Sequence, residues 1–377
     1  MPAYLDFCST TPVDTRVSAV VRHYMETDFG NAGSRTHEYG LIASQAVEEA
    51  RSYVADGCGA KPDEVLFTSG ATEANNLALL GLGQNARGTG RCHALALAIE
   101  HKAVLEPLEA LAMTKGVELD LVPVGESGWV DPEDLADRLR PDTFVVSTMH
   151  ANNETGVIQP LNDIAEVLQD HLAYWHVDAA QTFCKVGGLA HERIDLISLS
   201  GHKLYGPMGV GALIARRRGY ERPPLSPLMF GGGQERGLRP GTVPVPLVAG
   251  LGEACRLALS EQDKRSVACA AARSKATKAF EPLEPTHNGD QNQVLPHVMN
   301  LSIPGLDAEA AMMILRDLVA ISNGSACTSS SYEPSHVLSA MGLAPERASG
   351  ALRVSWSHDP VLVDWVDVAE RLAHALR

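Results

Sequence analysis

The sequence predicts an α/β protein with a large domain built on a mainly parallel, seven-stranded sheet and a smaller α+β domain. From about residue 63 to 215, short apolar runs alternate with amphipathic stretches, as in a parallel sheet covered by helices. A segment rich in Pro and Gly, from Arg222 to Pro246, then ends this alternation. The chain has 377 residues, which is enough for two domains.

The strands of the large domain are expected where apolar residues run together over four to six positions. They are Val65–Thr68, His93–Ala98, Glu118–Val122, Phe144–Met149, Tyr174–Val177, Ile194–Leu199 and Gly209–Ile214. Helical patterns lie between them, at Ala71–Leu82, Ala103–Thr114, Pro132–Leu139 and Leu161–His171.

The C-terminal part begins with one long helical stretch, at about Leu247–Glu281. Two strand-like runs follow, Val298–Ile303 and Leu352–Trp356, mixed with further helical sequence. We therefore expect a large domain at 15–255. The small domain is expected to combine 1–14 with 256–377.

Composition narrows the functional classes. The net charge of −15 disfavours direct contact with nucleic acid or an anionic membrane surface. No apolar run approaches the ~20 residues of a membrane span, and no secretory leader opens the chain, so we expect a cytoplasmic protein. The seven cysteines are scattered without a CxxC pair, which predicts free thiols and no metal site.

A lysine and an acid end two neighbouring strands. Lys203 follows the run Ile194–Leu199, and Asp178 follows the run that ends at Val177. Open α/β sheets bind ligands at the carboxyl ends of their strands. A pyridoxal phosphate (PLP) enzyme needs a lysine to hold the cofactor and a carboxylate to pair with its ring nitrogen. The alternative is an ordinary surface lysine.

Other polar groups are expected at the same edge. The turn Thr68–Glu73 leads from a strand into a helix and is suited to an anion, although it also reads as a plain turn. His101 opens the next helix and can stack on a planar ring or serve only as a helix-start residue. Asn152 and Asn153 can donate hydrogen bonds to a cofactor or substrate oxygen, although an Asn pair is also common in loops, and Gln181 can reach the phenolic oxygen of the cofactor.

Three further features carry chemistry. The glycine-rich segment Gly231–Thr242 contains arginines suited to an anion, or is a flexible linker. Arg353 lies in an apolar run and needs an anionic partner, either a substrate carboxylate or a structural acid. Cys327 stands among the small residues Ser322–Ser331, with nothing large beside it to bury the sulfur, and the expected loop is 322–334.

With these residues assembled, the chain resembles the NifS/IscS-type cysteine desulfurases of the class V aminotransferase family, from Tyr4 to about Arg353. The resemblance implies the PLP-dependent aminotransferase fold of type I. It rests on eight motifs in order: Gly30–Ser34, Thr68–Asn75, Glu100–Lys102, Met149–Gly156, His176–Gln181, Ser200–Gly206, Gly231–Thr242 and Gly324–Ser329.

The resemblance implies a role for each site residue. Lys203 would hold PLP, Asp178 would pair with its ring nitrogen and His101 would stack on the ring. The remaining implied cofactor contacts are Ala71, Thr72, Asn153, Gln181, Ser200, His202 and, from the second subunit of a homodimer, Thr242. Arg353, Asn153 and Asn31 would bind the substrate, and Cys327 would be the nucleophile on a mobile loop.

The reaction implied is conversion of L-cysteine to L-alanine, with a persulfide on Cys327. In its loop and length the chain resembles the DndA-type desulfurases, which implies delivery of sulfur to DNA phosphorothioate modification through a DndC-like acceptor. An iron–sulfur scaffold is the alternative acceptor. The rival functions are a selenocysteine lyase, an aminotransferase and a catalytically silent scaffold. A nucleotide-binding domain is disfavoured because the sequence has no phosphate-loop motif.

Overall fold

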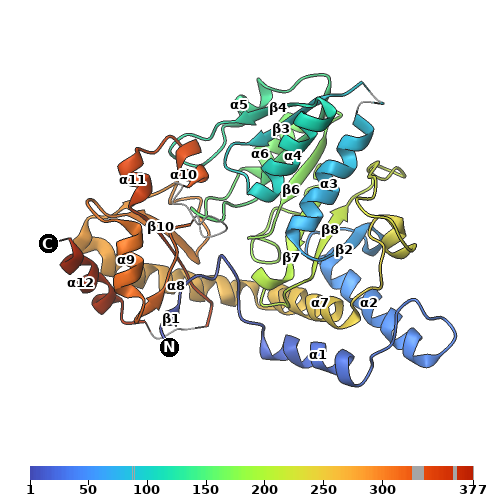
Figure 1. Ribbon diagram of the computed structural model, residues 1–377, viewed down its shortest axis with the longest axis horizontal. Coiled ribbons are helices and arrows are strands. Elements are labelled where there is room, and N and C mark those ends of the chain that lie inside the picture. Colours follow the sequence, from blue (N-terminus) through green and yellow to red (C-terminus); the bar gives the residue numbers. More distant parts are fainter. Residues whose placement is uncertain (87, 89, 325–334, 360–362, 377) are drawn as a thin grey trace.

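The computed structural model describes residues 1–377 apart from 87, 89, 325–334, 360–362 and 377. It has two lobes, with the larger one containing the long sheet and the smaller one the C-terminal third of the chain (Figure 1). In the described part of the chain, no helix is both long and apolar enough to cross a membrane.

The large lobe contains a seven-stranded sheet. Its strands are β2 (Val65–Thr68), β3 (His93–Leu97), β4 (Glu118–Val122), β5 (Thr143–Met149), β6 (Tyr174–Asp178), β7 (Leu196–Ser200) and β8 (Gly211–Ala215). They are ordered β2-β8-β7-β6-β5-β3-β4. Only β8 runs antiparallel to its neighbours β2 and β7, so the mainly parallel sheet predicted from the sequence is confirmed.

Helices cover both faces of this sheet. They are α1 (Thr15–Glu26), α2 (Glu38–Asp56), α3 (Ala71–Ala86), α4 (Lys102–Lys115), α5 (Pro132–Ala136), α6 (Leu161–Leu168) and α7 (Val245–Ser260). Alternate strand residues enter opposite hydrophobic clusters, because successive side chains of a strand point to opposite faces. Leu66 belongs to the cluster that includes residues of α3 and α4, whereas Phe67 belongs to the cluster that includes residues of α2, α6 and α7.

The small lobe has its own core. Strands β9 (Thr286–His287), β10 (Val298–Ser302) and β12 (Ala351–Ser355) form an antiparallel sheet in the order β12-β10-β9. The helices of this part are α8 (Gln262–Phe280), α9 (Ala308–Leu315), α10 (His336–Ala340), α11 (Pro345–Ser349) and α12 (Trp365–Ala375). Residues of α8, α9 and α12 pack on β10 and β12 in a separate hydrophobic cluster.

The N-terminal segment belongs to both lobes. Strand β1 (Ala3–Tyr4) pairs with β11 (Val319–Ala320), and Leu5 enters the core of the small lobe. Further along, Thr11 donates its backbone N–H to the carbonyl of His202 in the large lobe. The segment between them therefore passes through the junction of the lobes.

One expected element is different. The stretch predicted as a single helix from Leu247 to Glu281 is two helices, α7 and α8, because Glu261 has non-helical backbone angles (φ −114, ψ 9). The expected domain boundary at residue 255 lies inside α7. We therefore propose Glu261 as the point where the large domain ends.

Candidate active site

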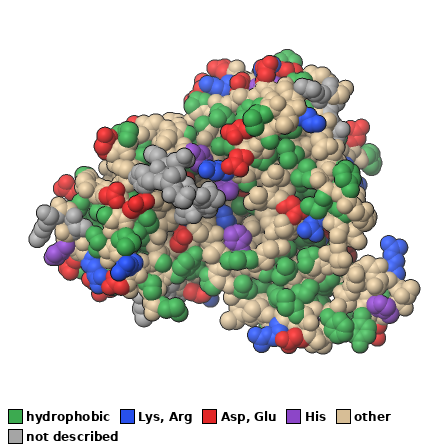
Figure 2. All heavy atoms as spheres, in the orientation of Figure 1, with side chains coloured by type: hydrophobic (Ala, Val, Ile, Leu, Met, Phe, Trp, Pro, Cys, Tyr) green, Lys and Arg blue, Asp and Glu red, His purple; other side chains and the backbone are tan. Residues whose placement is uncertain are grey.

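A cavity of about 460 Å³ lies at the carboxyl ends of β3, β5, β6 and β7. In the middle of the face shown in Figure 2, between the two lobes, histidine, basic and acidic side chains gather. Nine residues predicted from the sequence line the cavity: Ala71, Thr72, His101, Asn153, Asp178, Gln181, Ser200, His202 and Lys203.

Asp178 is the last residue of β6 and is buried at the floor of the cavity. Its Oδ2 accepts a hydrogen bond of 2.8 Å from Asn75 Nδ2, and its Oδ1 accepts one of 2.9 Å from the backbone N–H of Ala180. Both donors are neutral. The carboxylate is thus held in place while its negative charge stays available to a cationic ligand.

Asn75 is a site residue for which the sequence analysis assigned no role. It lies on α3, one turn after the predicted anion-binding turn, and its Oδ1 is buried without a partner among the described residues. The helical spacing from Ala71 was the available signal, because residues four apart share a helix face.

The turn before α3 forms a cradle at one end of the cavity. Gly70 has φ of +155, which favours glycine, and a Cβ at Gly211 of the adjacent strand β8 would lie 2.7 Å from the Gly70 Cα. The N-terminal N–H groups of the 16-residue helix α3 open here, beside the side chain of Ser200. Such a helix end attracts an anion such as a phosphate group.

Arg239 of the glycine-rich segment has an acid of the protein as its partner. Its Nε donates to Glu73 Oε1 at 3.0 Å, and Glu73 also accepts from the backbone N–H of Ser69. This ion pair balances the charge of Glu73 next to the cradle.

His101 caps the start of α4. Its Nδ1 accepts a hydrogen bond of 3.0 Å from the backbone N–H of Ala103, so the proton of the neutral ring is on Nε2. Burial lowers the pKa of His101. A neutral, fixed imidazole is suited to lie against a planar cofactor ring.

Lys203 ends a short 3-10 turn, Gly201–Lys203, directly after β7. The turn is tied to the N-terminal segment, because Thr11 Oγ1 donates to the carbonyl of His202 at 2.9 Å and His202 Nδ1 lies 3.1 Å from Thr10 Oγ1. Burial lowers the pKa of His202 to about 4, so its ring is neutral near pH 7. Ser9 and Thr10 also line the cavity, although the sequence analysis gave them no role.

Gln181 and Asn153 face the cavity from two different loops. The Gln181 amide donates to the carbonyl of Cys8 at 2.9 Å, while its buried Oε1 has no partner among the described residues. Asn152 is instead structural, since its Oδ1 accepts from the N–H groups of Glu154 and Thr155.

Arg353 lies behind the cavity wall and is not among the lining residues. It is buried on β12, where its Nη2 is 2.7 Å from Asp6 Oδ1 and 2.8 Å from Ser9 Oγ. Its Nη1 donates to the carbonyl of Asn153, and its buried Nε has no partner among the described residues. Two of these contacts, Ser9 and Asn153, line the cavity.

Besides Arg353, three predicted site residues are not placed in the cavity. Thr242 and Asn31 are exposed, and Asn31 Oδ1 accepts from the backbone N–H of Gly33. Cys327, with most of the predicted loop 322–334, lies outside the described residues.

Buried glutamates contact the residues that flank this undescribed segment. Glu154 Oε2 accepts from Ser335 Oγ at 2.5 Å, and a Cβ at Gly324 would lie 2.8 Å from the same oxygen. His336 Nε2 lies 2.9 Å from the carbonyl of Glu100. The described residues on both sides of 325–334 therefore contact the loops after β3 and β5, a connection that no local sequence pattern indicated.

The residues present fit PLP. The anion cradle, the carboxylate of Asp178 and the unpartnered Gln181 oxygen lie around one cavity with Lys203 and the ring of His101. In chemical character the cradle suits the phosphate of the cofactor and the Asp178 carboxylate suits its ring nitrogen. The Gln181 oxygen suits its hydroxyl, and the Lys203 amine suits its aldehyde.

Known proteins are similar over nearly the whole chain. The family model of class-V aminotransferases matches residues 3–359. The cysteine desulfurase IscS of Dechloromonas aromatica is 42% identical over 357 residues, which are 94% of this chain and 87% of that protein.

Solved structures are also similar to this chain over nearly its whole length. DndA from Streptomyces lividans has 54% sequence identity and a TM-score of 0.83, with 93% of this chain and 98% of that chain covered. SspA, solved in complex with cysteine, has 34% identity and a TM-score of 0.84, with 95% and 100% covered. By these similarities and by the groups around its cavity, the chain belongs to the class-V aminotransferase family, in its cysteine desulfurase group, and its cofactor is PLP.

Proposed function

We propose that this protein converts L-cysteine to L-alanine and retains the sulfur as a persulfide on Cys327. The observation that carries the proposal is the cavity in which Lys203, Asp178 and His101 meet an anion cradle. The relatives named as cysteine desulfurases support the reaction, and SspA in complex with cysteine supports the substrate.

Bound PLP supplies an electron sink for the charge left when the Cα–H bond of the substrate breaks. The Asp178 carboxylate balances the positive charge on the cofactor ring. The amine of Lys203 removes the Cα proton and returns it during alanine formation. The Cys327 thiol loses its proton and attacks the substrate sulfur as a thiolate, so that a new S–S bond replaces the substrate C–S bond. The electrons of the broken bond remain on Cβ, which takes up the released proton to give the methyl group of alanine.

Arg353 is proposed to bind the substrate carboxylate. Its contacts with Ser9 and Asn153 bring the guanidinium to the cavity wall, and its unpartnered Nε leaves a donor available. Asp6 holds the same group at 2.7 Å, so the substrate would add to or replace an existing acidic partner.

We further propose that the sulfur passes to a DndC-like protein for DNA phosphorothioate modification. The identity of 54% with DndA supports this acceptor over an iron–sulfur scaffold. The net charge of −15 supports sulfur delivery through a protein, without direct contact with DNA. Selenocysteine as the preferred substrate is the alternative to be tested.

A homodimer is proposed for the working enzyme. Thr242 is exposed in the single chain and would complete the phosphate site of a second subunit. Phe29 and Phe230, which are 66% and 90% exposed, support a covering partner on these loops. The described cysteines form no disulfide, which is typical of a reducing compartment and supports the cytoplasm as its location.

The test is incubation of the PLP-loaded protein with L-cysteine, with alanine measured and the Cys327 peptide weighed by mass spectrometry. We expect alanine and one added sulfur on Cys327, both lost in Cys327→Ser while the cofactor absorbance remains. Cys92→Ser is the matched control and should behave as the wild type. Equal alanine formation by Cys327→Ser would overturn the persulfide role, and faster turnover of selenocysteine would favour the lyase.

A further inference from the structure

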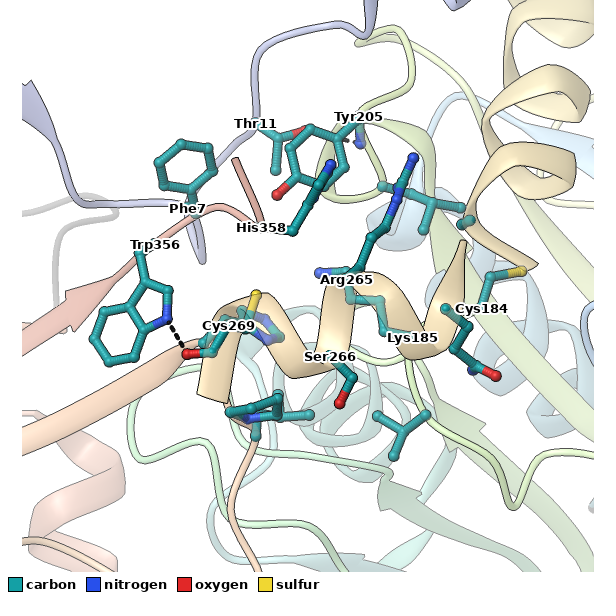
Figure 3. Close-up of a pocket in the computed structure, with 17 residues that line it drawn as sticks. Phe7, Thr11, Cys184, Lys185, Tyr205, Arg265, Ser266, Cys269, Trp356 and His358 are labelled. Atoms are coloured by element: carbon teal, nitrogen blue, oxygen red, sulfur yellow. Dashed lines mark hydrogen bonds between the residues drawn. The ribbon is translucent and has the colours of Figure 1, made fainter. Parts of the chain in front are cut away.

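A second, smaller cavity lies at the junction of the two lobes. It has a volume of about 50 Å³, far below that of the active-site cavity, and is large enough for a few waters or one small ion. Figure 3 shows its lining, with Arg265, Ser266 and Cys269 on α8, and Phe7 and Thr11 from the N-terminal segment.

Lys185 lines this cavity and has no acidic partner. Within the described chain its ammonium group forms no ion pair and no hydrogen bond. The ionisable groups that act on it most strongly are two thiols, Cys8 and Cys269, and two cations, Lys203 and Arg265. Burial lowers the pKa of Lys185 to about 8. Lys185 is only partly exposed, and a charge that is partly removed from water is normally stabilised by a counter-ion.

Two further nitrogen atoms on the lining lack partners. His297 is 8% exposed, and its Nε2 has no hydrogen bond among the described residues. His358 Nδ1 is likewise buried without a partner there. Arg265, which also lines the cavity, is itself paired with two carboxylates, Glu261 at 2.8 Å and Asp14 at 3.9 Å. The cavity therefore presents an ammonium group and two imidazoles, with no carboxylate of its own.

We propose that this cavity binds one small monovalent anion of the size of chloride or hydrosulfide, between Lys185 and the ring of His297. Its volume excludes a nucleotide or a second PLP. The site is separate from the proposed reaction and does not depend on it. The N-terminal segment divides the two cavities, since Ser9 and Thr10 line the active site while Phe7 and Thr11 line the anion site.

The direct test uses crystals of the PLP-loaded protein soaked in sodium bromide, with anomalous diffraction. We expect a bromide peak within hydrogen-bonding distance of Lys185 Nζ, inside the cavity. In solution, bromide should raise the Tm by about 1–3 °C over gluconate at equal ionic strength, because gluconate is too large to enter.

Lys185→Met should abolish the difference between bromide and gluconate, whereas Lys278→Met, at an exposed lysine of α8, should keep it. If Lys185→Met does not fold, the diffraction experiment and the comparison of the two anions in the wild type still show whether the cavity binds an anion. An empty or water-filled cavity in bromide, together with equal Tm values in both salts, would overturn the proposal. None of these measurements depends on desulfurase turnover, so the outcome is independent of the proposed function.

Discussion

Asp178 and Glu235 are two buried carboxylates that differ in how their charge is balanced. Glu235 accepts from Arg51 through both oxygens, at 2.9 and 3.0 Å, and from the backbone N–H of Phe67. Asp178 accepts from the Asn75 amide and the backbone N–H of Ala180, and both of these donors are neutral. The difference separates a carboxylate whose charge is balanced within the fold from one whose charge is left for a ligand.

Glu235 also fixes an unusual backbone. It and Arg236 have φ of +43 and +58, which costs about 1–3 kcal/mol at residues other than glycine. The bidentate pair with Arg51 offsets this cost and anchors the glycine-rich segment to α2 and β2. The glycine-rich segment Gly231–Thr242 is therefore an anchored loop, which argues against its interpretation as a flexible linker.

The largest effect on activity is expected in the cavity that contains Asp178, at Lys203. Lys203→Ala should lower alanine formation by at least about 10³-fold, because the proposed covalent anchor and proton carrier of the cofactor is lost. The measurement is turnover of L-cysteine, with circular dichroism to verify the fold. Lys278→Met is the matched control on an exposed helix face, and near-normal activity of Lys203→Ala would contradict the assignment.

Asp178→Asn tests the unbalanced carboxylate directly. The amide is similar in size but carries no charge, so kcat should fall about 10²-fold or more while the unfolding free energy changes little. The cofactor absorbance should shift as well, because the ring nitrogen loses its anionic partner. Unchanged absorbance and kcat would show that Asp178 does not pair with the ring.

Glu235→Gln should give the opposite result. It removes the buried counter-charge of Arg51 and leaves it only the exposed Glu48, at 3.2 Å, so the unfolding free energy should drop by about 3–5 kcal/mol. Turnover per folded molecule should stay near the wild-type value at temperatures where the variant is folded. Denaturant unfolding measures the first effect, and a double variant, Arg51→Met with Glu235→Leu, should recover part of the loss. A stable but inactive Glu235→Gln would remove the distinction between the two carboxylates.

The two carboxylates also show which features the sequence can predict. Asp178 was found because it follows an apolar strand, and the same local pattern located Lys203 and His101. Glu235 and Glu154 act through residues far away in the chain, so no periodicity marks them, whereas Asn75 is marked only by its helical spacing from Ala71. The break at Glu261 was missed for a related reason. No Pro or Gly stands there, and α7 and α8 contribute residues to two different hydrophobic clusters.

The smallest expected effect concerns a carboxylate near the surface. Glu261 pairs with Arg16 and Arg265 at the junction of α7 and α8, and hydrogen bonding to Arg16 lowers its pKa to about 2. A lowered pKa means that the pair stabilises the fold above the unfolded value of about 4.5 and loses this contribution as the pH falls toward 2.

Because the Arg16 side chain is 47% exposed, solvent screens the pair, and its contribution near pH 6 should be at most about 1 kcal/mol. Urea unfolding of the wild type and Glu261→Gln should therefore differ slightly at pH 6, and the difference should shrink between pH 5 and 3. Added salt should reduce it at pH 6, unlike the loss in Glu235→Gln, where the partner is buried. A difference that is independent of both pH and salt would mean that Glu261 stabilises the junction by packing and not by its charge.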